Sequence, residues 1–159
     1  MICNMLSAVS IMTGLCSGAT PQALSDKPPS FSITVAQKMI NAHRARHGLN
    51  ALAIDSRLNA AAKAHSRDLA RRNAASHRGS DGSYPKDRAR RAGYNPRLAS
   101  ENVAVGYTNT ADVIQSWKGS RGHNANLLRR GARHMGMGMV YRPNSGRETY
   151  WTLIIGKPR

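Results

Sequence analysis

The 159 residues correspond to one domain with a short leader, because single domains commonly span roughly 100–200 residues; two large domains are excluded. The hydrophobic fraction of 40% and the charged fraction of 20% are those of an ordinary globular chain, which excludes a largely disordered protein. Lys and Arg outnumber Asp and Glu by 24 to 8, for a formal charge of +16, so the composition predicts a cationic surface and polyanionic partners.

The start of the chain resembles a secretion signal. No charged residue precedes Asp26, and an apolar run is followed by small residues that end at Ala19. We therefore predict a signal peptide over 1–19 and a secreted or periplasmic protein. The Lys or Arg that usually opens such a signal is missing, so it stays open whether Met1 is the true start, as does lipid attachment at Cys16. The apolar run is too short for a transmembrane helix.

Both cysteines, Cys3 and Cys16, fall within this leader. The mature domain is thus predicted to lack disulfides, thiolate zinc ligands and a cysteine nucleophile. Residues 20–30 contain three prolines and are predicted to form a linker, so the folded domain is expected over 31–159.

Two amphipathic helices are predicted first, one over 33–47 with Ser32 as the N-cap and one that has Asp55 as its N-cap and ends near Asn73. Pro85 opens a short helix to Arg91, which Gly93 ends. The later elements are a chain break at Asn95 and Pro96, a strand over 101–107, a helix over 110–117 capped by Thr110, a short turn over 120–128, and two strands over 135–141 and 149–155 joined by a turn at 144–146. Helices followed by an antiparallel sheet indicate the α+β class.

An ordered series of short motifs spans about residues 33–155. It consists of NAHRARHG at 41–48, DSRL at 55–58, AAKAHS at 61–66, SH at 76–77, ENV at 101–103, WKGS at 117–120, GHNANLL at 122–128 and YWT at 150–152. This series resembles the CAP superfamily, which comprises the cysteine-rich secretory, antigen 5 and pathogenesis-related 1 proteins, and is similar to its bacterial, cysteine-free branch.

This resemblance implies an α-β-α sandwich with a small, mostly antiparallel sheet between helices, and a cleft lined by two histidines and two acidic residues. Three of these residues carry over, as His77, Glu101 and His123. The fourth position departs from the family pattern, because Ser120 and His134 stand where relatives carry Glu. Sterols or other lipids are ligands that the family implies.

The three cleft residues allow two roles. Imidazole nitrogens and a carboxylate oxygen suit zinc, so His77, Glu101 and His123 form a candidate open metal site. Alternatively, Glu101 accepts hydrogen bonds from the imidazoles and holds loops to the sheet. His43 and His47 share a helix face four residues apart, but neighbouring arginines favour a packed or solvated face over a metal site.

Basic residues concentrate between Lys63 and Arg97. Side chains that we expect to form one patch for phosphates, sulfated glycans or anionic headgroups are Arg67, Arg71, Arg72, Arg88, Arg90 and Arg91. The other interpretation is a merely soluble basic surface.

We hypothesise an exported, monomeric, non-enzymatic binding module that holds a metal or small ligand in the cleft and an anionic glycan, anionic lipid or sterol-like ligand as partner. A metal-assisted hydrolase using the same cleft is the alternative, although the sequence has no familiar hydrolase motif. A nucleic-acid-binding protein is a further alternative, disfavoured because aromatic residues are only 5% and no known binding motif is present.

Overall fold

A computed structural model of the protein describes residues 29–159. The predicted signal peptide, Cys3, Cys16 and nearly all of the predicted linker lie outside the described residues. Within 29–159, no helix is both long enough and apolar enough to cross a membrane.

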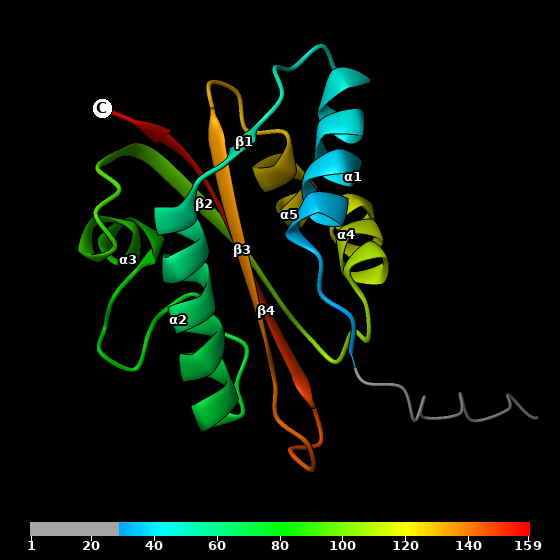
Figure 1. The fold of residues 1–159 in the computed structure, drawn as a ribbon, viewed down its shortest axis with the longest axis vertical. Helices are drawn as coiled ribbons and strands as arrows, with labels where there is room; N and C mark the ends of the chain where they lie inside the picture. Colours follow the sequence, from blue (N-terminus) through cyan, green and yellow to red (C-terminus); the bar gives the residue numbers. More distant parts are fainter. Residues whose placement is uncertain (1–28) are drawn as a thin grey trace, which may run out of the picture.

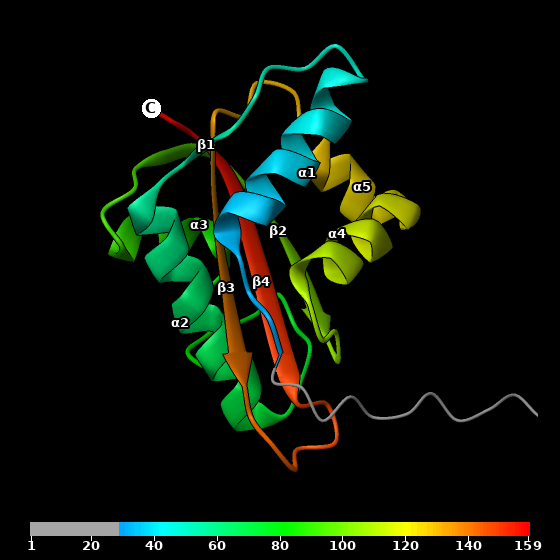
Figure 2. The same ribbon diagram turned by 45° about the vertical axis from the view of Figure 1, so that its right-hand side comes forward.

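A four-stranded sheet lies between two layers of helices (Figure 1). The strand order is β1-β3-β4-β2; β1 runs parallel to β3, and the other neighbours are antiparallel. Helices α2 and α3 lie on one face, while α1, α4 and α5 lie on the other, as the turned view shows (Figure 2). This arrangement confirms the α-β-α sandwich. In chain order the elements are α1 (Ile33–Ala45), β1 (Ala53–Ile54), α2 (Ser56–Arg72), α3 (Pro85–Arg91), β2 (Pro96–Val105), α4 (Thr110–Gly119), α5 (Arg121–Leu127), β3 (His134–Tyr141) and β4 (Thr149–Pro158).

Local caps set the bounds of the first two helices, as predicted. The side chain of Ser32 accepts a hydrogen bond from the backbone N–H of Val35, and Asp55 accepts one from the N–H of Arg57 at 2.9 Å. Each satisfies an N–H group that the helix itself leaves unpaired. Asn73 ends α2 in the left-handed conformation, with φ of 52°.

Two local predictions were wrong, and one strand was not predicted. Asn109, rather than Thr110, caps α4, because its side chain accepts a hydrogen bond from the N–H of Asp112. Pro96 does not break the chain but opens β2, which suits a residue that has no N–H to donate to the ladder. The two-residue strand β1 was not predicted, because its pairing with β3 depends on residues about eighty positions away.

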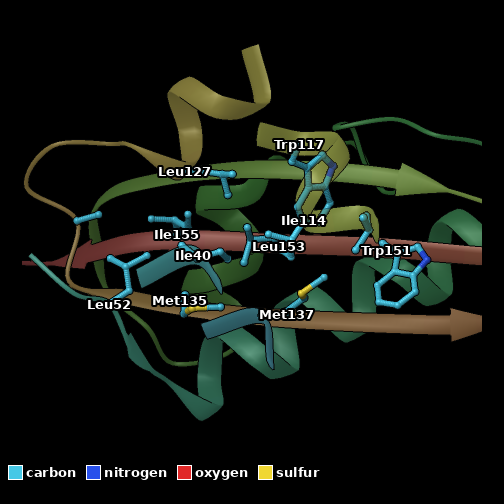
Figure 3. Packing of buried hydrophobic residues seen from close by; sticks show 13 residues of the cluster. Ile40, Leu52, Ile114, Trp117, Leu127, Met135, Met137, Trp151, Leu153 and Ile155 are labelled. Carbon is cyan, nitrogen blue, oxygen red and sulfur yellow. The ribbon is translucent and has the colours of Figure 1, made fainter. Parts of the chain in front are cut away.

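The sheet buries apolar side chains on both faces. One cluster, which includes Ile40, Trp117 and Leu153, fills the space beneath α1, α4 and α5 (Figure 3). On the opposite face, α2 packs so closely on β3 that a Cβ at Gly136 would lie 2.1 Å from the backbone carbonyl carbon of Leu58. The glycines of the predicted strand therefore serve close helix packing.

Candidate functional site

Glu101 is the centre of the candidate site. It lies in β2, at the edge of the sheet, and only 1% of its side chain is exposed. Its antiparallel partner is Ile154, which packs against α2 and α3. Because directly paired residues in adjacent strands point to the same face, the carboxylate lies beneath the α2/α3 layer.

Arg88 of α3 neutralises this buried carboxylate. Its Nη2 donates to Oε2 of Glu101 at 2.6 Å, and its side chain is only 7% exposed. The same guanidinium donates to the backbone carbonyls of Ser83 at 2.8 Å and His77 at 3.1 Å. Arg88 thereby fastens the loop before α3 to the sheet, as a buried charge must be both paired and hydrogen-bonded.

His77 occupies the other oxygen of the carboxylate. Its Nδ1 donates to Oε1 of Glu101 at 3.0 Å, while 52% of its side chain is exposed. The hydrogen bond to Glu101 raises the pKa of His77 above its usual value, although partial burial opposes the shift. The ring is thus held on one side and open to solvent on the other.

His65 of α2 lies beside the same carboxylate. Its Nε2 donates to the backbone carbonyl of Ser76 at 2.8 Å and lies 3.7 Å from Oε1 of Glu101. Burial lowers the pKa of His65, with Glu101 opposing the shift, so the neutral ring is favoured. The ring is fully buried and lies against the carboxylate, so His65 also belongs to the site.

His123 reaches the edge strand from the other helical layer. It lies on α5, with its Nδ1 3.0 Å from the hydroxyl of Ser120, and its carbonyl accepts a hydrogen bond from Asn102 of β2. Burial lowers the pKa of His123, and the positive charge of His77 contributes in the same direction. Ser120 and His123 are in contact, and their role in a cleft stays a prediction.

A zinc site requires several free ligand atoms. Both oxygens of Glu101 accept hydrogen bonds, from Arg88 and His77, and Glu101 makes no hydrogen bond to His123. Among residues 29–159, no three His, Cys, Asp or Glu side chains are placed to hold a metal ion. The described side chains thus do not supply a three-ligand geometry for zinc, and the metal site stays a prediction. The alternative role of Glu101 was to accept hydrogen bonds from both imidazoles and hold loops to the sheet. The hydrogen bond from His77 is present, and the one expected from His123 is not.

His134 lies elsewhere on the sheet. It opens β3, its Nδ1 is 3.0 Å from the hydroxyl of Tyr94, and β4 separates its strand from that of Glu101. His43 and His47 pack edge to face at 4.6 Å between ring centres, and Nε2 of His43 donates to Asn124. These contacts are those of a packed helix face.

One residue of the predicted basic patch is not at the surface, and four of the other five form ion pairs. Arg88 is buried, so it is not part of a surface. Asp68 pairs with both Arg71 and Arg72, and further pairs join Arg90 to Asp87 and Arg91 to Asp81. Of the six predicted patch residues, Arg67 is exposed without an ion pair to any other described residue.

Hydrogen bonds and ion pairs together stabilise the charged form of Asp68. Burial would raise the pKa of Asp68, but hydrogen bonds from Ser80 and Arg71 outweigh it and hold the pKa at about 2. A groove of about 570 Å³ opens here between α2 and the segment from Gly79 to Ala92. Its lining combines four arginines with two aspartates, so cations stay in excess there.

Sequence reasoning missed three members of the site, namely Arg88 and the two amide side chains, Asn102 and Asn126, that join β2 to α5. Asn126 donates to the backbone carbonyl of Glu101 at 2.9 Å and to the side chain of Asn102 at 2.8 Å. No local spacing marks these partners, since 13 to 25 positions separate them from Glu101 or Asn102. The sequence did hold one signal. The chain has only 8 acidic residues, and a buried carboxylate needs a cation beside it, so a basic partner is expected for any carboxylate that is buried.

Comparisons with known proteins agree with this architecture. The uncharacterized protein YkwD of Bacillus subtilis is 34% identical over 121 residues, which are 76% of this chain and 45% of that protein. An extracellular protein of Bacillus anthracis that contains an SCP domain superposes with a TM-score of 0.70 at 29% identity, covering 78% of this chain and 39% of the other. The chain thus spans less than half the length of both relatives.

An outer surface protein of Borrelia burgdorferi has the same fold, with a TM-score of 0.69 at 22% identity, covering 79% of this chain and 92% of the other. The family described as CAP, the cysteine-rich secretory protein family, matches residues 37–155. This match over most of the chain shows that the chain belongs to the CAP family.

Proposed function

We propose that the chain is a non-enzymatic, extracellular binding domain that holds anionic polymers on its surface by charge. The single observation that carries the proposal is the excess of exposed arginines and lysines that lack an ion pair within the described residues. Only seven Asp and Glu residues fall in this part of the sequence, and most are already paired. An extracellular site of action is supported by the signal-like leader and by the extracellular relative from Bacillus anthracis.

The state of Glu101 favours binding over hydrolysis. A general base must have an oxygen within reach of the proton that it removes. Both oxygens of this buried carboxylate face a protein donor, Arg88 on one side and His77 on the other. The geometry therefore suits a structural clamp between loop, helix and strand better than a base, and the metal-assisted hydrolase gains no supporting contact.

Binding to heparin as a function of salt tests the proposal. At 0.1 M salt, charges are screened over about 10 Å, and at 1 M over about 3 Å, so a charge-driven complex should weaken steeply across this range. Uncharged dextran of similar length is the matched control and should not bind at any salt concentration. Heparin binding that does not respond to salt, or equal binding of dextran, would contradict the proposal.

A further inference from the structure

Exposed cations without an ion pair lie in more than one part of the described protein. On α2 and α3, Arg71, Arg90 and Arg91 pair with aspartates, whereas Arg67 does not. A second group gathers where β3 begins, β4 ends and β2 begins, which is the end of the sheet that carries the C-terminus in Figure 1. We call it the sheet-end cluster, and its members are Arg97, Arg129, Arg130, Arg133 and Lys157.

Backbone pairing holds these positions together. The N–H of Arg133 donates to the carbonyl of Gly156 at 2.9 Å, which places Arg133 beside Lys157. Lys157 pairs in register with Leu98, the residue after Arg97. Neighbouring strands lie about 4.8 Å apart, so the three backbone positions fall within roughly 10 Å across the end of the sheet.

The turn before β3 adds two more arginines. The N–H of Ala132 donates to the carbonyl of Arg129, which folds this segment tightly next to Arg133. Buried Arg44 of α1 donates to the same carbonyl at 3.2 Å and to that of Leu127 at 2.8 Å. The turn is thereby fixed to α1, so its arginines are presented from an anchored backbone.

No described Asp or Glu side chain pairs with the cluster. None of its five members forms an ion pair within residues 29–159. Asp55, which follows β1, is already bound by Arg57 at 2.6 Å. Four members of the cluster are exposed, namely Arg97, Arg129, Arg130 and Arg133, and Lys157 is half-buried. These like charges therefore face solvent within about one screening length of each other.

Resting on the proposed function, we infer that the sheet-end cluster is the surface on which the domain binds an anionic polysaccharide. Arginine side chains offer paired N–H groups that match sulfate, phosphate or carboxylate groups, which such a polymer presents in succession. The exposed large apolar residues are Phe31, Val35, Ile54, Tyr84 and Tyr141, and none belongs to the cluster. The surface therefore offers neither a wedge for a lipid bilayer nor a ring on which nucleic-acid bases would stack.

Two triple variants of equal charge separate this surface from net charge alone. The first replaces exposed cluster residues, as Arg97→Gln, Arg130→Gln and Arg133→Gln. The matched control replaces ion-paired arginines, as Arg71→Gln, Arg90→Gln and Arg91→Gln. Circular dichroism and urea unfolding of both variants verify that the fold is retained.

The measurement is the affinity for heparin at 0.1 M salt. Because each exposed charge contact contributes modestly, loss of three should weaken binding by about tenfold in the cluster variant. The control variant should change affinity by less than about twofold, because its arginines are occupied by aspartates in the free protein.

Each other outcome overturns a definite part of the reasoning. Equal weakening in both variants would show that net charge alone drives binding, and greater weakening in the control would place the surface on α2 and α3; either result refutes the inference and leaves the proposed function standing. If the unaltered protein does not bind heparin, the proposed function fails as well. Tighter binding to phosphatidylglycerol vesicles or to a single-stranded oligonucleotide than to heparin at the same salt would refute the polysaccharide as the partner.

Discussion

Replacement of Arg88 by Met is expected to be among the most damaging single changes at the site. It removes the one cation that both lies within 2.6 Å of the Glu101 carboxylate and is itself buried. Met retains much of the side-chain volume, so the main effect is an uncompensated charge in the interior rather than a cavity. The carbonyls of Ser83 and His77 also lose their donor.

The magnitude follows from these contacts. Breaking a buried ion pair by removal of one partner costs about 3–5 kcal/mol. Arg90→Met is the matched control, because Arg90 lies in the same helix but is exposed and sits 3.6 Å from an exposed Asp87. An exposed pair of this kind contributes about 0–1 kcal/mol. The two variants should thus differ by roughly 3 kcal/mol in the free energy of unfolding.

Urea unfolding followed by tryptophan fluorescence measures this difference, since Trp117 and Trp151 are both buried in the core. In the double variant Arg88→Met with Glu101→Leu, much of the lost stability should return, because replacing both partners removes the unpaired charge. If Arg88→Met costs no more than Arg90→Met, the central role of the ion pair is refuted.

Two further changes test the site and the packing. The raised pKa of His77 means that its contact with Glu101 stabilises the fold most below the unfolded pKa of about 6.5 and that this contribution is lost as pH rises through the folded pKa. The free energy of unfolding of the protein and of His77→Gln is measured at a series of pH values. The unaltered protein should be more stable by less than about 1 kcal/mol at pH 5.5, because the half-exposed ring is screened, and this difference should shrink by pH 8. A difference in stability that grows with pH would contradict the contact. Gly136→Ala should destabilise the domain by about 1–3 kcal/mol or more, because its Cβ would overlap the backbone of α2. Gly119→Ala, where nothing lies within 4 Å, should be neutral or stabilising by up to about 1 kcal/mol, and equal thermal midpoints for the two variants would disprove the close packing.

Local residues determined the parts of the fold that the sequence predicted well. Ser32 and Asp55 each cap a helix through an atom only two or three positions away, and Asn73 ends one by its own backbone conformation. Such interactions depend on a few consecutive residues, so they can be read from their spacing. The order of the motifs likewise sufficed to identify the family, which the match over 37–155 confirms.

Tertiary structure alone decided the roles of the charged residues. Arg88 and Arg90 stand two positions apart in one short helix, yet the first is buried against Glu101 and the second is exposed. A helix of 7 residues has two sides, and only the position of β2, 13 residues further along the chain, determines which side is buried. The density of cations between Lys63 and Arg97 was visible in the sequence. The ion pairs that some of them form with aspartates, and the placement of Arg97 and Arg133 at the same end of the sheet, were not visible. Both depend on distances in space that long-range strand pairing creates.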